Sequence, residues 1–299
     1  DVTANFRDKN QMKEVLSAAK IPVARQAKIH SLEEVQQFLL KVQYPIILKP
    51  LAGVGSKNTV RVTTEKELFS ALNLLLPSPS NPIQAEEFVQ GEEHTLESVS
   101  INGKVVWQSS TYYLPGPLAV LENPYLQYCV LLPKQRKQDH VKKFSRINEK
   151  ALKALGMETG LSHMEWFLQE SGRSLVSEVG ARPPGVNIMT MFSIAHGVNI
   201  WDNWAELMVQ DRWKLPRRKY AVGSAFLRYQ GGNKQIKSIT GIEEIRKNLA
   251  DRWVDAKLPF VGQHKSSHYE GDGWIIVKGK SNESVIEDLR MILNTIEIR

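Results

Sequence analysis

The sequence is poor in cysteine and has no long apolar run. Among its 299 residues only Cys129 carries a thiol, so no disulfide can form within the chain. This scarcity favours a reducing compartment, and we expect a cytoplasmic protein. No segment approaches the roughly 20 apolar residues that cross a bilayer, and residues 1–10 lack the apolar run of a targeting signal. We therefore expect no membrane partner.

An excess of positive charge does not by itself indicate nucleic-acid binding. The formal net charge is +7, and basic residues cluster at 134–143 and 217–219. Acidic residues are interspersed and no nucleic-acid motif is present, so a solvated helix face explains Lys137, Lys142 and Lys143 better. Binding of a polyanionic nucleotide is a second use for such charge. We expect no nucleic-acid partner.

Short alternating segments indicate the α+β class, with largely antiparallel sheets. Apolar residues at helical spacing over 12–19 precede a short apolar strand at 44–49. Asn102-Gly103 between two alternating stretches is typical of a hairpin with a tight primed turn. Residues 189–209 are predicted as one helix.

A change of pattern near Gln90 predicts two lobes. The small lobe, residues 1–90, contains a leading helix. The larger lobe, residues 91–299, ends in a C-terminal subdomain.

A second predicted hairpin, residues 163–182, brings two acidic side chains together. If Ser171 and Gly172 are the two turn residues, Glu165 lies directly opposite Glu178, and carboxylates in that arrangement repel each other. A divalent cation would resolve the conflict, and oxygen ligands suit Mg²⁺ shared with phosphates. The alternative is a solvent-exposed hairpin whose register differs by one residue. The predicted face of the acidic pair also carries His163, Phe167 and Val176.

Arg182 follows this hairpin and leads into Pro183-Pro184-Gly185. A rigid turn there would hold the guanidinium beyond the acidic pair. Its planar fork suits a developing phosphoryl or carboxylate charge. The alternative is a surface salt bridge.

Lys49 ends an apolar strand, where a lysine is poorly accommodated unless its ammonium reaches an anion. The adjacent loop, Gly53-Val-Gly-Ser56, can bring backbone N–H groups to phosphate oxygens as a nest. No Gly-Lys-Thr/Ser opens a helix here, so the loop is not a Walker A motif. A plain hairpin turn is the alternative reading.

The acidic segment at 86–93 lies at the predicted lobe boundary. Free backbone groups at a strand end can pair with an adenine edge, and Glu93 is placed to accept ribose hydroxyls. Taken alone, the segment also reads as an acidic linker.

Taken in order, these segments resemble the ATP-grasp superfamily, in its branch of carboxylate-amine ligases. The resemblance runs from about Phe6 to the C-terminus. It implies two lobes that clamp a nucleotide, with ATP and Mg²⁺, or Mn²⁺ in its place, as cofactors. It also implies roles for particular residues: phosphate contacts for Lys9 and Lys49; a mobile loop at Gly53, Gly55, Ser56 and Lys57; adenine contacts for Glu86, Glu87, Phe88 and Val89; ribose contacts for Glu93; metal ligation by Glu165 and Glu178; and catalysis by Arg182.

Two features depart from the family pattern. The family's Asn, its third metal ligand, is Gly180 here, and Asn187 or water could supply the missing oxygen. Family members usually carry a further N-terminal α/β domain before the Lys9 helix, so we expect this chain to be a fragment.

The resemblance implies transfer of the ATP γ-phosphoryl group to a carboxylate, giving an acylphosphate that an amine attacks. The expected partners are a small-molecule acid and amine, with a homodimer left open. His163, Arg228 and Trp201 are the predicted lining of the substrate pocket. One alternative is a biotin-carboxylase-like or formate-type ligase. An alternative of another class is an inactive nucleotide-binding or sensor module.

Overall fold

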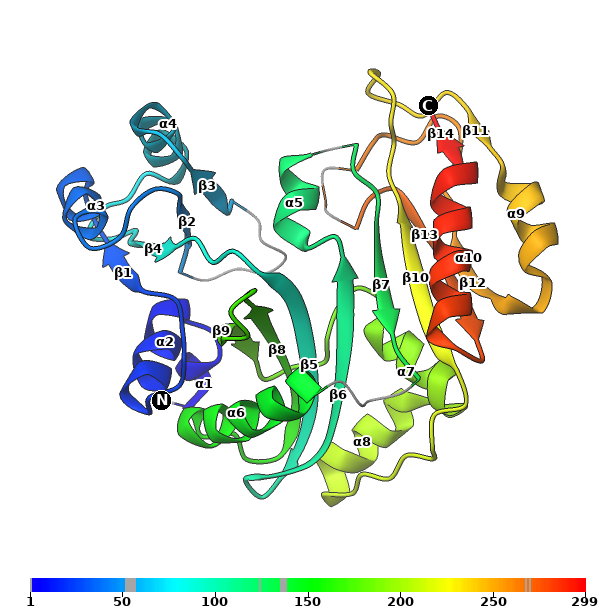
Figure 1. Cartoon of the computed structure of the whole chain (residues 1–299), viewed down its shortest axis with the longest axis horizontal. Helices are drawn as coiled ribbons and strands as arrows, with labels where there is room; N and C mark the ends of the chain where they lie inside the picture. Colours follow the sequence, from blue (N-terminus) through cyan, green and yellow to red (C-terminus); the bar gives the residue numbers. More distant parts are fainter. Residues whose placement is uncertain (1, 52–57, 124, 135–138, 267, 269) are drawn as a thin grey trace. The chain divides into compact units, whose positions relative to one another are not determined.

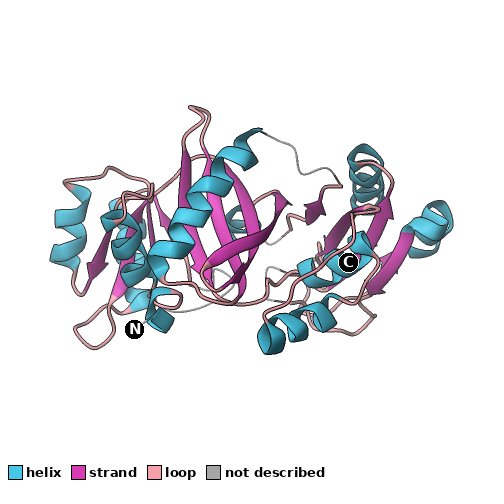
Figure 2. Ribbon diagram, turned by 90° about the horizontal axis from the view of Figure 1, so that it is seen from below, coloured by secondary structure: helices cyan, strands magenta, loops and turns pink. Residues whose placement is uncertain are grey.

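The computed structural model describes residues 2–51, 58–123, 125–134, 139–266, 268 and 270–299. Contacts divide the chain into unit 1, Asp1–Val105 with Lys142–Arg182, and unit 2, Val106–Val141 with Pro183–Arg299. Helices and antiparallel strands are mixed in both units, as the α+β prediction requires (Figure 2). Gln90 lies inside unit 1. The two units are compact groups of contacts rather than the predicted lobes, and the lobe boundary at Gln90 stays a prediction.

Unit 1 contains a four-stranded antiparallel sheet in the order β1-β4-β2-β3 (Figure 1). The strands are β1 (Gln26–Ile29), β4 (Ile83–Glu87), β2 (Ile46–Pro50) and β3 (Val60–Val62). Helices α3 (Leu32–Leu39) and α4 (Glu65–Leu75) pack their apolar residues into one core with these strands. The sheet thereby holds the end of β2, where Lys49 lies.

Side-chain caps explain where α3 and α4 begin. Ser31 accepts a hydrogen bond from the backbone N–H of Glu34, and Thr64 accepts one from that of Glu67. Each glutamate reaches back to the backbone N–H of the residue before its cap, His30 or Thr63. The donors left open at a helix start are thus satisfied, as in a capping box.

Three further strands of unit 1 pair in the order β5-β8-β9. They are β5 (Glu92–Ile101), β8 (Gly160–Leu168) and β9 (Ser174–Gly180), and all pairs are antiparallel. Helix α6 (Asp139–Leu155) contributes Phe144, whose ring stacks on Trp166 of β8 at 3.9 Å. The predicted primed turn after β5 is confirmed, because Asn102 and Gly103 both have positive φ, 50° and 75°.

The β8–β9 hairpin confirms that Glu165 lies opposite Glu178, although the predicted turn was wrong. Gln169 N–H donates to the carbonyl of Arg173, so the turn has three residues, 170–172, with Gly172 at φ +76°. A register shift beyond Glu165 absorbs the extra residue.

The register shift also corrects the predicted face. Val176 pairs with Trp166 rather than with Phe167. Because side chains alternate along a strand, Val176 lies on the face opposite the acidic pair.

Unit 2 is built on strands in the order β12-β13-β10-β7-β6. They are β12 (Trp253–Lys257), β13 (Gly273–Gly279), β10 (Ala221–Leu227), β7 (Tyr128–Leu132) and β6 (Lys104–Leu114), which begins in unit 1. Helix α10 (Asn282–Thr295) packs closely on β10, since a Cβ at Gly223 would lie 2.7 Å from Val285 and Leu289. The other elements of this unit are α5 (Pro117–Glu122), α7 (Ile188–His196), α8 (Ile200–Gln210), β11 (Ile239–Thr240), α9 (Ile242–Leu249), the 3₁₀ helix η1 (Ala250–Arg252) and β14 (Glu297–Ile298).

The helix predicted over 189–209 is two helices, α7 and α8. Gly197 ends α7 in the left-handed conformation at φ 69°, and Asn199 caps α8 by accepting from the backbone N–H of Trp201. The short helices α1 (Val2–Asn5) and α5 and the strand β12 were not predicted. Within the described residues, no helix combines the length and apolar character needed to cross a membrane.

Candidate functional site

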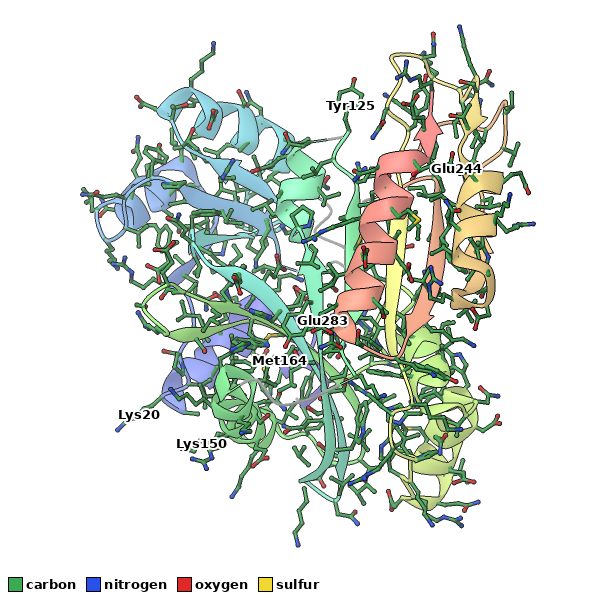
Figure 3. The ribbon with its side chains drawn as sticks, turned by 45° about the vertical axis from the view of Figure 1, so that its right-hand side comes forward. Lys20, Tyr125, Lys150, Met164, Glu244 and Glu283 are labelled. Carbon is green, nitrogen blue, oxygen red and sulfur yellow. The ribbon has the colours of Figure 1, made fainter. Side chains whose placement is uncertain are left out.

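One face of the β5-β8-β9 strands is polar. Strand β5 places Thr95 opposite Glu165 and Glu97 opposite His163, and β9 places Glu178 opposite Glu165. Alternation along β5 adds Glu93 to this face. On the reverse face lie Met164, labelled in Figure 3, and Trp166, both fully buried, together with buried polar side chains such as His94 and Ser162. The polar face is defined by Glu93, Glu97, His163, Glu165 and Glu178.

The carboxylates of this polar face compete for positive charge. Burial, and then the charge of Glu165, raises the pKa of Glu93 to about 8, although Lys49 and His163 oppose the shift. Burial also acts to raise the pKa of Glu165, but His163, Arg182 and Lys49 outweigh it and the pKa is lowered. The pKa values of the two carboxyls are therefore shifted in opposite directions: the ionised form is disfavoured for Glu93 and favoured for Glu165.

His163 lies between two carboxylates. Its Nδ1 lies 2.9 Å from Glu97 Oε1, and its Nε2 lies 3.5 Å from Glu165 Oε1. Burial lowers its pKa, but hydrogen bonds to Glu165 and Glu97 raise it to about 9. The ring is thus held as an imidazolium that orients Glu165 above the fully buried Glu97. The substrate contact expected of His163 stays a prediction.

Two of the predicted lysines reach this region from other elements. Lys9 opens α2 (Lys9–Ala18), whose N-cap is Asp8, and its Nζ lies 3.1 Å from Glu178 Oε1. Lys49 on β2 places its Nζ 2.8 Å from Glu86 Oε1 on the neighbouring strand β4. Burial opposes its charge, but Glu86 and then Glu178 raise the pKa of Lys49 overall. Lys9 thus pairs with one acid of the pair, and Lys49 lies in the electrostatic field of both.

Lys13 is a third lysine, which the sequence reading missed. It lies one helical turn after Lys9, is 1% exposed, and its Nζ lies 2.5 Å from Glu86 Oε1. Burial lowers its pKa to about 8, against the charge of Glu86. The i, i+4 spacing from Lys9 on one helix face was the available signal.

The segment predicted to hold adenine has its acidic side chains already engaged. Glu86 binds the two lysines, and its pKa is lowered to about 2 because they outweigh the effect of burial. Glu87 accepts from Arg25 Nε at 2.7 Å. The backbone N–H of Phe88 donates to the carbonyl of Pro45 at 3.3 Å, and Val89 is half-buried. Any adenine contact here would use the remaining backbone groups or the apolar side chains.

Gly180, which stands where the family has Asn, makes room for Arg182. A Cβ at Gly180 would lie 3.3 Å from Cγ and Nε of Arg182, closer than is comfortable. The arginine side chain therefore lies over the backbone where a larger side chain would project. Arg182 and Glu165 attract each other electrostatically, which places the guanidinium in the field of the acidic pair.

Three predicted residues belong to unit 2. Asn187 donates to Ser224 Oγ at 3.3 Å, and Arg228 is buried, with its pKa lowered by burial. Trp201 is 46% exposed on α8. Their substrate or metal roles stay predictions. The loop residues Gly53, Gly55, Ser56 and Lys57 lie outside the described residues.

The polar face suits a hard divalent cation. Glu165 and Glu178 lie opposite each other on adjacent strands, and a cation beside them would relieve their repulsion. In the described part of the chain, no three His, Cys, Asp or Glu side chains surround a common point. Mg²⁺ is commonly held by one or two carboxylates together with phosphates and water, and Glu165 and Glu178 could supply those carboxylates.

A groove of about 750 Å³ runs along α2, β1 and α3. None of the residues predicted for the site lines it, although Lys13 does. Its size suits a small molecule, but its walls lack the acidic pair.

Comparisons with known proteins agree with this geometry. The family model described as the ATP-grasp domain matches residues 14–194. An L-arginine-specific L-amino acid ligase of Bacillus subtilis is 23% identical over 245 residues, covering 80% of this chain and 58% of that protein. The crystal structure of an L-amino acid ligase from Bacillus licheniformis superposes with a TM-score of 0.79 at 23% identity, over 100% of this chain and 73% of the other.

A more distant solved structure was determined with nucleotide. The biotin carboxylase domain of Hydrogenobacter thermophilus 2-oxoglutarate carboxylase, in complex with MgADP and bicarbonate, has a TM-score of 0.70 at 18% identity, over 98% of this chain and 66% of the other. The likeness to both solved structures concerns the fold. The chain spans about half the length of the curated relatives it matches, 45% and 58% of the first two.

Proposed function

This chain belongs to the ATP-grasp domain family, and on that premise we propose that unit 1 binds ATP with Mg²⁺ and that the whole protein is a carboxylate-amine ligase. One observation carries the proposal: two carboxylates, Glu165 and Glu178, face each other on adjacent strands, with Lys9 and Lys49 beside them. Opposed acids next to buried lysines are costly to maintain unless a ligand uses both signs of charge.

Each side chain has a distinct task in this proposal. Glu165 and Glu178 would hold Mg²⁺, which neutralises phosphate charge when it is bound. Lys9 and Lys49 bind phosphate oxygens, and Lys9 exchanges its contact with Glu178 for one with the nucleotide. His163 keeps Glu165 ionised and oriented. The protein contributes mainly position and preset charge, as is usual in phosphoryl transfer.

The proposed reaction has two steps. A carboxylate oxygen of the acid attacks the γ-phosphorus of ATP, and the bond to the β,γ-bridging oxygen breaks, which releases ADP and leaves an acylphosphate. The amine then attacks the acyl carbon, the C–O bond to phosphate breaks, and the amine loses a proton as the amide forms. Arg182 stabilises the negative charge that develops on the transferring groups. No side chain of the protein needs to act as a nucleophile.

Amino acids are the favoured substrates, because the L-arginine-specific relative from Bacillus subtilis and the solved structure from Bacillus licheniformis are both L-amino acid ligases. A biotin-carboxylase-like or formate-type ligase is the second candidate, which the biotin carboxylase neighbour favours. An inactive nucleotide-binding module would bind Mg-ADP without turnover. Incubating the purified protein with Mg-ATP and pairs of amino acids, and measuring ADP together with the mass of the product, separates the three.

In that assay, amino-acid-dependent ADP release with a dipeptide mass supports the proposal. ADP release that depends on bicarbonate or formate supports the second candidate. Nucleotide binding with no acid-dependent ADP release across the screen would contradict a ligase. We further propose that the partners of the protein are small molecules only and that it is located in the cytoplasm. We also propose that the boundary between the two lobes lies near Gln90. The protein is proposed to form a homodimer, which analytical ultracentrifugation would test.

A further inference from the structure

Lys13 is a buried lysine that the proposed function does not use. It lies 1% exposed on α2, and its Nζ is 2.5 Å from Glu86 Oε1. The same oxygen lies 2.8 Å from Lys49 Nζ and accepts from Gln84 Nε2 at 2.6 Å. Two lysine ammonium groups and the side-chain amide of Gln84 therefore converge on one carboxylate oxygen.

We propose that Lys13 is a positioning residue: it shares Glu86 with Lys49 and so leaves the charge of Lys49 available to the phosphates of a nucleotide. The inference rests on the proposed function and adds to it a residue outside the predicted site. Lys13 lines the groove along α2, β1 and α3. The charged groups that act on it are Glu86, Lys49 and Glu178.

The charge balance of this cluster carries the argument. Glu86 supplies one negative charge to two lysine ammonium groups. Without Lys13, Glu86 and Lys49 would form a closed, neutral pair in a region of low dielectric constant. A phosphate would then have to break that pair before it could bind Lys49. With Lys13 present, the cluster keeps a surplus positive charge, and Lys49 can turn to an anion while Glu86 stays neutralised.

Hydrogen bonding around Glu86 supports the same reading. Lys13 and Glu86 form a close, buried ion pair, so the charge of Lys13 is its main contribution here. Gln84, itself fully buried, holds the carboxylate in place by donating to it, and Gln84 also donates to Gln26 Oε1. The position of the Glu86 carboxylate is thus fixed. When Lys13 neutralises it, the ammonium group of Lys49 can bind a phosphate.

The test measures binding of Mg-ADP and of adenosine by calorimetry. Lys13→Met keeps much of the buried volume and removes the charge, Lys13→Arg keeps the charge, and Lys150→Met removes a charge from the exposed face of α6 (Figure 3). We expect Lys13→Met to raise the Kd for Mg-ADP about tenfold or more. Adenosine, which has no phosphate, should bind as it does to the wild type. Lys13→Arg should recover most of the affinity, and Lys150→Met should not change it.

The double variant Lys13→Met/Glu86→Gln provides a second test. Removing both charges leaves Lys49 unpaired, so Mg-ADP should bind more tightly than to Lys13→Met. Lys13→Gln, which removes the charge but can still donate a hydrogen bond to Glu86, replaces Lys13→Met if that change prevents folding, and it should show the same rise in the Kd for Mg-ADP.

Several outcomes would overturn the inference. Unchanged Mg-ADP affinity in folded Lys13→Met would do so, as would equal losses for Mg-ADP and adenosine or a further loss in the double variant. These results leave the proposed function standing, because the wild type still binds nucleotide. A wild type that binds no Mg-ADP would overturn both.

Discussion

Replacing Glu86 by Gln should strongly destabilise unit 1 at neutral pH. Glu86 is 6% exposed and is the shared counter-ion of Lys13 and Lys49. Glutamine has nearly the same shape but carries no charge. Two buried ammonium groups would then lack an anion, and removing one partner of a buried ion pair typically costs about 3 to 5 kcal/mol.

The pKa of Glu86 gives a second estimate of the same cost. It is lowered from 4.5 to about 2, and at about 1.4 kcal/mol per pKa unit this corresponds to about 3 kcal/mol. Because the folded-state pKa is the lower one, this stability is present above pH 4.5 and is lost as pH falls toward 2. The difference between wild type and Glu86→Gln should therefore be about 3 kcal/mol at pH 7 and about 1 kcal/mol at pH 3.

Hydrogen exchange at increasing urea concentrations, followed in β2 and β4, measures the unfolding free energy of unit 1 separately from unit 2. Lys150→Met, which removes an exposed charge, is the control and should differ little from wild type. A Glu86→Gln variant that loses less than about 1 kcal/mol at pH 7 would refute the electrostatic account of this cluster. An equal loss at both pH values would refute it as well.

Three further predictions concern the candidate site. Lys49→Met should raise the Kd for Mg-ADP by roughly 10- to 150-fold in calorimetry, because a charge-assisted contact contributes about 1.5 to 3 kcal/mol. Glu178→Gln should abolish ADP release. It should change the free energy of unfolding of the metal-free protein by no more than about 1 kcal/mol, because loss of the ion pair with Lys9 offsets relief of the repulsion with Glu165. A large loss of stability with activity kept would point to a structural role. His163 has its pKa raised to about 9, so its stabilisation should be complete below pH 6.5 and fall by about 3 kcal/mol as pH rises toward 9. His163→Gln should lack this dependence in pH-dependent melts, and a variant that retains it would show that the bridge to Glu97 is not its source.

The predicted hairpin shows how local errors can cancel. The sequence identifies two strands, a glycine turn and two acids, and these are enough to place Glu165 opposite Glu178. The three-residue turn and the compensating shift depend on packing of Trp166 and Val176 against the apolar side, which alternation alone does not reveal. The acidic pair was predictable, whereas the face on which Val176 lies was not.

Long-range pairing is the part of the site that the sequence could not predict. Lys13 and Glu86 are far apart along the chain, and His163 pairs with Glu97 from another strand. Local patterns predict the helix and strands that carry these residues, but not which lysine meets which carboxylate. The division of residues 189–209 into two helices could have been predicted from the sequence. Gly197 is a signal for the end of the first helix, and Asn199, two residues later, is a signal for the N-cap of the second.

Calorimetric titration of the metal-free chain with ADP, in the presence and absence of Mg²⁺, tests the central claim most directly. The account predicts saturable binding at one site, tighter with Mg²⁺, weakened by Lys49→Met, and with its Mg²⁺ dependence lost in Glu178→Gln. Hydrogen exchange on the same samples verifies that each protein is folded. A folded wild type that shows no binding, or binding that neither substitution alters, would contradict the assignment of this acidic and basic cluster as a nucleotide site.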